Sequence, residues 1–235
     1  MKSINIVLFI VSFLFTQNLK SQPNCDLETL LDDTLIEKID YRKYFNNIDF
    51  LKALRFKKID FIGFIGKNKK RLKVTFTSIS KNINDLNCYL IEGFTTVANV
   101  NNRSFKGEFN IIDNFIFTEP MFAEEIASEN FGFSVFSFQL KENPKETFTG
   151  IFEGSAILMW SRNNDVAEYE DIFDGYDGNR NYQFIGKWTS YKTGNSSFVA
   201  WGQNRIPCAG ELDIGVGEFS PNPKYYQYGW EDYKP

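Results

Sequence analysis

The spacing of apolar residues changes once along this chain. Over residues 26–45, apolar residues recur every three or four positions and form one stripe, which predicts an amphipathic N-terminal helix. From about residue 57 onward, apolar and polar residues alternate, as they do when successive side chains point to opposite faces of a sheet. The pattern therefore predicts a helical segment over residues 22–56, followed by a β-domain over residues 57–201.

Eight segments of the β-domain carry the alternating pattern. They cover residues 59–66, 72–80, 89–97, 105–112, 131–140, 148–160, 183–191 and 197–201. Short turn-like connections separate most of them, and such spacing is typical of antiparallel all-β folds. We expect an up-and-down meander of about eight strands that closes as a barrel, with a β-sandwich as the alternative.

One predicted strand changes phase. In residues 131–140 the apolar set moves from one face to the other between Val135 and Phe136. One extra residue at this point, a β-bulge, would return the later residues to the core. The pattern therefore predicts a bulge within this strand.

Four strands contain the same phrase: a bulky apolar residue, any residue, Gly, any residue, and a second bulky apolar residue. The four copies begin at Phe61, Phe105, Phe148 and Phe184. In a strand, the Gly and both bulky residues of each copy fall on one face. A Gly leaves a gap that an aromatic ring of the adjoining strand can cover, and it lets the strand coil sharply. The phrase therefore favours a closed barrel over a flat sandwich.

The last copy includes Gly186-Lys187-Trp188, which resembles the Gly-x-Trp motif of lipocalins and avidin-like proteins, together called calycins. The resemblance covers these three residues. It implies a secreted antiparallel barrel that holds a small apolar ligand. The richness of the chain in Asn, Lys, Ile and Phe is also similar to that of secreted proteins of the Bacteroidota, and this similarity is one of composition.

The two ends of the chain differ from the β-domain. Residues 1–21 begin with Met1-Lys2 and continue with a nearly unbroken apolar run, which predicts a signal peptide cleaved near Ser21 and export to the periplasm or the medium. No later stretch approaches about 18 apolar residues, so we expect no membrane span in the mature chain.

Residues 202–235 are rich in Pro, Gly and aromatic residues, which predicts a coil packed on the barrel.

Composition narrows the possible chemistry. The chain contains no His, so Ser-His-Asp and Cys-His nucleophiles lack their proton shuttle, and the common zinc and copper ligand sets are missing. We therefore expect neither an enzyme nor a cofactor. The formal net charge of −4 is ordinary and argues against a nucleic-acid partner.

Three cysteines remain after the predicted cleavage, namely Cys25, Cys88 and Cys208. An odd count allows one disulfide and one free thiol in an oxidising compartment. Both Cys88–Cys208 and Cys25–Cys208 are possible pairs, and the sequence does not choose between them.

Three sets of residues are candidate sites. If the barrel has a cavity, its lining would include Trp160, Trp188 and Trp201, although 25 Phe residues favour a filled interior. An acidic, Gly-rich stretch is either a solvated loop or a calcium site, and its candidate ligands are Asp171, Asp174 and Asp177. In a strand, Glu211 and Asp213 would share one face, as the carboxylates of a hydrolase could.

The sequence therefore predicts an exported β-barrel protein that serves as a binding or interaction module. Its partner would be a small apolar ligand or a protein. A structural protein with a filled core and a carboxylate-based hydrolase are the alternatives.

Overall fold

The computed structural model of this chain describes residues 25–33, 41–44, 47–55, 61–118, 130–169 and 181–233. The predicted signal peptide lies outside these segments. Within them, no helix is long and apolar enough to cross a membrane.

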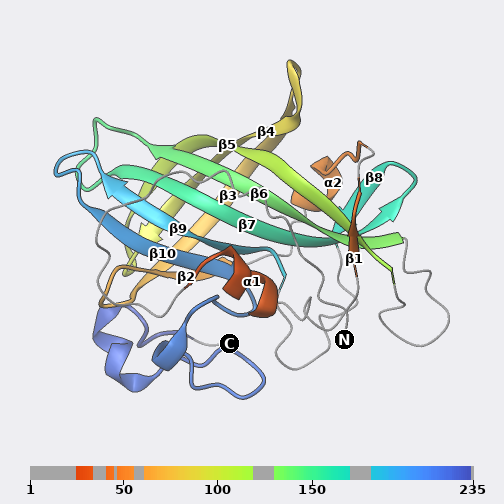
Figure 1. Cartoon of the computed structure of the whole chain (residues 1–235). Helices are drawn as coiled ribbons and strands as arrows, with labels where there is room; N and C mark the ends of the chain where they lie inside the picture. Colours follow the sequence, from red (N-terminus) through yellow and green to blue (C-terminus); the bar gives the residue numbers. More distant parts are fainter. Residues whose placement is uncertain are drawn as a thin grey trace.

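Strands dominate the described segments (Figure 1). They are β1 (Tyr41–Lys43), β2 (Phe61–Ile65), β3 (Lys70–Asn82), β4 (Asp85–Val97), β5 (Val100–Phe117), β6 (Phe131–Glu142), β7 (Gly150–Asn163), β8 (Val166–Tyr169), β9 (Gln183–Ser190) and β10 (Ser196–Gln203). The helices are α1 (Leu27–Asp33), α2 (Leu51–Leu54) and the short 3-10 helices η4 (Gly210–Leu212) and η5 (Pro223–Tyr228). The predicted mainly β fold is confirmed.

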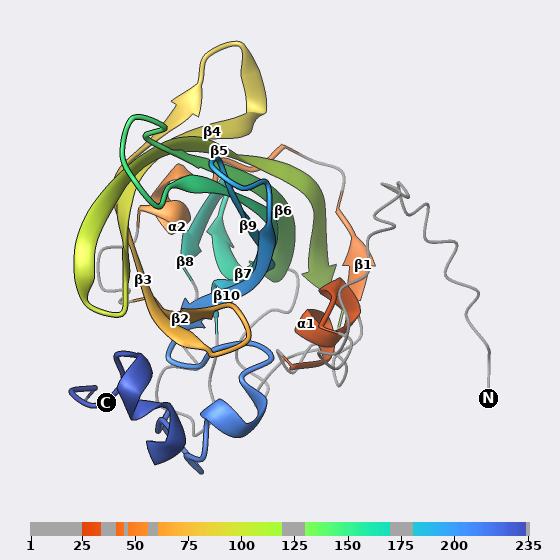
Figure 2. The ribbon, with the colours of Figure 1, turned by 90° about the vertical axis from the view of Figure 1, so that its left-hand side faces the viewer.

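Eight of these strands form a ring of antiparallel neighbours (Figure 2). They keep the order of the chain around the ring, from β2 through β7 to β9 and β10, and β10 pairs with β2 to complete it. The predicted antiparallel pairing and number of strands are confirmed. The alternating pattern does not reveal β1 and β8, which pair with β5 and β7 outside the path of the ring.

Aromatic side chains fill the inside of the ring. Phe184 stacks on Trp201 with ring centroids 4.8 Å apart, and Phe138 lies edge-on to the same Trp at 5.0 Å. At one end, α2 closes the ring, because Phe50 at its start packs against Trp160 at 5.9 Å. Figure 2, which looks along the ring, shows α2 and β8 within its outline.

A second core lies on the outside of the ring, and it explains the phase change in β6. Phe133 belongs to this outer core, whereas Phe136 belongs to the inner one. The ring of Tyr41 in β1 covers Phe133 at 5.0 Å. Both faces of β6 are therefore buried. The predicted bulge in β6 is wrong, since β6 pairs with β7 without a register shift. The extra residue is Ile112 of β5, where the register with β6 shifts.

The N-terminal segment differs in part from its prediction. Within the helix expected over residues 26–45, α1 covers Leu27–Asp33, and residues 34–40 lie outside the described segments. Tyr41–Lys43 forms β1 and pairs with the end of β5. The predicted helix is therefore wrong at its C-terminal end, because pairing with a distant strand overrides the local helical pattern there.

The segment after β10 packs against the outside of the ring. The buried Arg71 of β3 donates a hydrogen bond to Oδ1 of Asp232 at 2.8 Å, and its guanidinium lies 5.1 Å from the ring of Tyr233. Trp230 Nε1 donates to the carbonyl oxygen of Lys69 at 2.7 Å. These contacts hold the segment against the turn between β2 and β3.

A disulfide joins α1 to the same C-terminal segment. Cys25 and Cys208 form the bond, with their Cα atoms 6.0 Å apart. Of the two pairings that the sequence allows, the structure therefore contains Cys25–Cys208. Cys88 is a buried free thiol.

Glycines on the inner face let neighbouring strands approach closely. Gly154 of β7 lies opposite Gly186 of β9, and a Cβ on Gly154 would lie 2.0 Å from the carbonyl oxygen of Ile185. A Cβ on Gly150 would lie 2.8 Å from the Trp188 ring, so an aromatic ring covers a glycine as the repeated phrase predicts. The phrase fails at Phe148, which lies in the turn before β7 and is 86% exposed.

We predict that Gly154→Ala lowers the free energy of unfolding by about 1–3 kcal/mol, because the added Cβ meets backbone atoms of β9. Ser155→Ala, on the opposite face of the same strand, should change it by less than about 0.5 kcal/mol. Urea unfolding followed by circular dichroism measures both. Equal losses in the two variants would contradict the close approach at Gly154.

We also predict that Cys208→Ser lowers the free energy of unfolding by about 2–5 kcal/mol, because the disulfide closes a long loop. Cys25→Ser should have the same effect, and the double variant should lose no more than either single variant, since all three lack the same bond. Urea unfolding without reductant is the measurement, and additive losses would refute the pairing.

Candidate functional site

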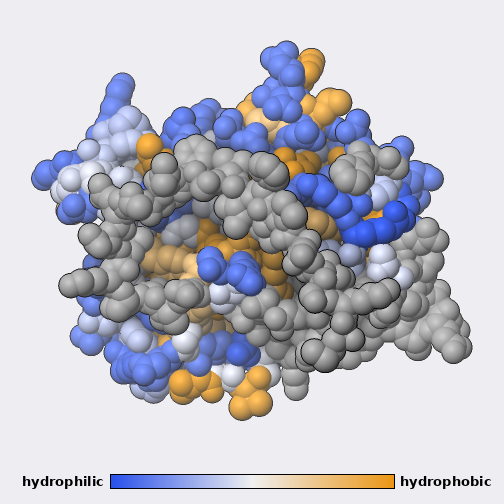
Figure 3. All heavy atoms as spheres, in the orientation of Figure 1, coloured by the Kyte–Doolittle hydropathy of each residue, from blue (hydrophilic) through white to orange (hydrophobic). Residues whose placement is uncertain are grey.

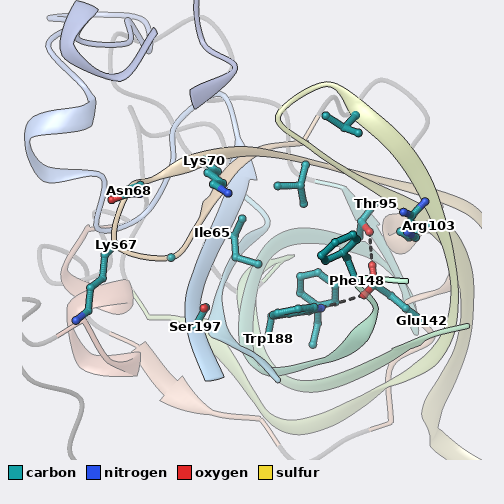
Figure 4. A pocket seen from close by; sticks show the side chains of 14 residues that line it. Ile65, Lys67, Asn68, Lys70, Thr95, Arg103, Glu142, Phe148, Trp188 and Ser197 are labelled. Carbon is teal, nitrogen blue, oxygen red and sulfur yellow. Dashed lines mark hydrogen bonds between the residues drawn. The ribbon is translucent and has the colours of Figure 1, made fainter. Parts of the chain in front are cut away.

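A pocket of about 590 Å³ opens at one end of the ring, and Figure 4 shows its lining from close by. This end lies opposite α2 (Figure 1). The turn between β2 and β3, the start of β5, the loop between β6 and β7, and β9 contribute to its wall. Six of its fourteen lining residues are bulky and apolar, namely Ile65, Val97, Val100, Phe148, Phe152 and Trp188.

The lining includes one buried carboxylate, that of Glu142 at the end of β6. The residue is 3% exposed. Its Oε1 accepts a hydrogen bond from Thr95 Oγ1 at 2.7 Å (Figure 4). Its Oε2 accepts from the backbone N–H of Gly150 at 2.8 Å and from Trp188 Nε1 at 2.9 Å. One carboxylate thus connects β6 to β4, β7 and β9.

The environment of Glu142 changes its acidity. Burial raises the pKa of its carboxyl group above the ordinary value, because the charged form loses water. The three hydrogen bonds and the positive charge of Arg103 lower the pKa without cancelling this effect. Tyr191 donates its hydroxyl to the backbone carbonyl of Glu142 at 3.2 Å, and its own pKa is raised by burial and by the Glu142 charge.

Positive side chains surround the opening. Arg103 of β5 donates through Nε to the carbonyl oxygen of Thr147 at 3.0 Å, and its Nη1 lies 3.8 Å from Oε2 of Glu146. Lys67 and Lys70 also line the pocket, and neither forms an ion pair within the described segments. The lining therefore contains three cations and one buried carboxylate.

The three predicted lining tryptophans occupy different places. Trp188 lines the pocket. Trp160 and Trp201 are fully buried in the inner core, where Trp160 Nε1 donates to Ser134 Oγ at 2.8 Å. The sequence pattern puts all three on inner faces, and it does not distinguish the filled middle of the ring from its open end.

The two acidic candidates do not form a site in the described chain. Asp171, Asp174 and Asp177 lie outside the described segments. Elsewhere, no group of three or more Cys, Asp or Glu residues is placed to hold a metal ion within the described chain.

The predicted strand placement of Glu211 and Asp213 is wrong, because Glu211 lies in η4. Glu211 forms an ion pair with Lys224. Asp213 pairs with Arg205 Nε at 3.0 Å and also accepts from two backbone N–H groups. Each carboxylate thus has its own cation. The chain forms a 3-10 helix at Glu211 instead of the strand that would bring the two carboxylates to one face.

Glu142 is absent from the candidates that the sequence suggests, although the alternation in β6 marks it. Residue 142 follows Phe136, Phe138 and Leu140 at steps of two, so an acidic side chain is placed on the inner face. A charged residue at such a position indicates either a paired structural group or a functional one.

The hairpin between β3 and β4 carries a separate apolar surface. It projects from the ring at the end away from the pocket, and apolar atoms lie at its tip (Figure 3). Ile83 and Leu86 there are 93% and 59% exposed. The tip shares no residue with the pocket.

No model of a known protein family, no curated protein and no solved structure gives a significant match to this chain. This result neither supports nor contradicts the resemblance to calycins, which rests on Gly186-Lys187-Trp188.

We predict that the stability of the wild type falls, relative to a Glu142→Gln variant, as the pH rises from about 4.5. A raised pKa means that the folded state holds the proton more tightly than the unfolded chain. The contribution of Glu142 is therefore largest below its ordinary pKa and is lost as the pH rises through the raised pKa. Urea unfolding of both proteins across this range is the measurement, and a constant difference would refute the prediction.

Proposed function

We propose that this chain is an exported β-barrel protein that binds a small ligand in the pocket at the open end of its ring. The pocket carries the proposal. Ligand sites in proteins are typically concave, of roughly 300–1,000 Å³, mostly apolar, and provided with a few fixed polar groups. This pocket combines an apolar wall with Glu142, whose position is fixed by hydrogen bonds from three strands.

The ring of eight strands supports the barrel part of the proposal, since every strand in it has two neighbours. The disulfide between Cys25 and Cys208 supports the export part, because such bonds persist in oxidising compartments. The apolar run at the start of the sequence also supports export.

The filled interior limits the places where a ligand could bind. Phe138, Phe184 and Trp201 pack against one another in the middle of the ring, at centroid distances of 4.8–5.6 Å. The ligand therefore occupies the mouth of the ring and rests on this packed core. Such an arrangement keeps the filled core of the structural alternative and adds a binding site to it.

We predict that the neutral apolar dye N-phenyl-1-naphthylamine binds the wild type, and that Val100→Trp weakens this binding at least tenfold. Val100 is exposed at the rim of the pocket, so a larger side chain there obstructs the opening. The matched control is Val166→Trp, at an exposed valine of β8 on the other end of the ring. Fluorescence titration measures the affinities.

Two results would contradict the proposed site. One is the absence of dye binding to the wild type. The other is an equal loss of affinity in both valine variants, which would place the dye elsewhere or show a general loss of folding. Thermal unfolding of each variant distinguishes these causes.

A further inference from the structure

We infer that the ligand of this pocket is an anionic amphiphile, whose apolar body contacts Phe148 and Trp188 and whose acidic group is bound by Arg103. The inference rests on the proposed function of the pocket and adds the chemical class of the ligand. It follows from two features of the rim, a strained exposed aromatic residue and an excess of positive charge.

Phe148 is the first feature. Its side chain is 86% exposed and lines the pocket. Its φ of 58° lies in the left-handed region, where a bulky residue is a genuine outlier. Such a conformation costs about 1–3 kcal/mol and persists only where the surroundings impose it. Here Thr149 Oγ1 donates to the carbonyl of Glu146 at 2.8 Å, and the Gly150 N–H donates to Glu142.

Phe148 is not buried in return for this strain. The ring makes no contact with another aromatic residue there, and it faces the opening of the pocket (Figure 4). Strained residues cluster at ligand-binding sites, where they hold a group ready for the ligand. An apolar group of the ligand would cover Phe148 and, deeper in the pocket, Trp188.

The charge of the rim is the second feature. Arg103, Lys67 and Lys70 line the opening, whereas the chain as a whole has a formal net charge of −4. The positive region is therefore local. Glu142 is the single carboxylate among the lining residues against these three cations, so the lining keeps an excess of positive charge. A cleft lined by one sign of charge attracts ligands of the opposite sign.

Arg103 is the cation placed to bind an acidic group. It lies at the edge of the pocket near Phe148 and Glu142 (Figure 4). Its Nε donates to Thr147 and its Nη1 to the carbonyl of Asn102 at 3.3 Å, which fixes the guanidinium. A guanidinium has five N–H donors, so several stay available for a carboxylate or sulfonate. Its partner Glu146 is beyond hydrogen-bond distance, at 3.8 Å.

A matched pair of dyes tests the inference. The sulfonated dye 8-anilinonaphthalene-1-sulfonate has the same aromatic body as N-phenyl-1-naphthylamine and adds one negative charge. We expect the wild type to bind the sulfonated dye at least tenfold more tightly at low salt. This advantage should shrink as sodium chloride is added, because exposed charges are screened.

Variants assign the effect to residues. Arg103→Gln should weaken the sulfonated dye about tenfold and change the affinity for the neutral dye by less than twofold. Lys145→Gln, at an exposed cation of the loop between β6 and β7 that does not line the pocket, should change neither. Phe148→Ala should weaken both dyes. Dodecanoate should displace the sulfonated dye at lower concentration than dodecan-1-ol does.

The outcomes separate the inference from the function on which it rests. If both dyes bind the wild type equally at all salt concentrations, the ligand class is wrong and the binding pocket stands. The same follows if Arg103→Gln affects both dyes alike. If neither dye binds the wild type, both the function and the inference fail. The salt dependence of the wild type decides the question even if Arg103→Gln does not fold.

Discussion

Contact between a glycine on the inner face of one strand and the backbone or ring of the next holds this fold in its closed form. Where Gly154 faces Gly186, the backbones of β7 and β9 approach more closely than any side chain would allow. The sheet can therefore curl until β10 meets β2. At Gly150 the space is taken by the Trp188 ring, which also forms the wall of the pocket. Closure of the ring and formation of the site thus depend on the same residues.

Glu142 couples the inner core to the pocket. Burying a carboxylate costs free energy unless hydrogen bonds replace the lost water. Here hydrogen bonds from β4, β7 and β9 offset part of this cost. The side chain thereby fixes Trp188 through its Nε1 and fixes the start of β7 through Gly150. Phe148, with its strained backbone, lies two residues before Gly150, whose N–H donates to Glu142. One buried charge therefore positions both aromatic residues that we assign to the ligand.

The strands were predictable because most of them bury one face and expose the other. The pattern leads to a wrong bulge in β6 because Phe133, on the outer face of that strand, is also buried, by Tyr41 of β1. Alternation does not show which distant segment covers a strand. β1 and β8 have three and four residues, too few for a period to emerge. The site was less predictable. The sequence places Glu142 on an inner face, but its partners depend on the register of four strands, and the exposure of Phe148 depends on a turn.

The disulfide has a consequence for how the molecule withstands damage. Cys25 precedes β1 and Cys208 follows β10, so every strand of the ring lies inside one covalent loop. The β3–β4 hairpin and the turn that carries Phe148 lie inside it as well. A protease that cuts once in either connection leaves a single covalent molecule, with the strands on both sides of the cut still paired to their neighbours. In a compartment where proteases are abundant, a nick at the rim would open the chain without releasing a fragment.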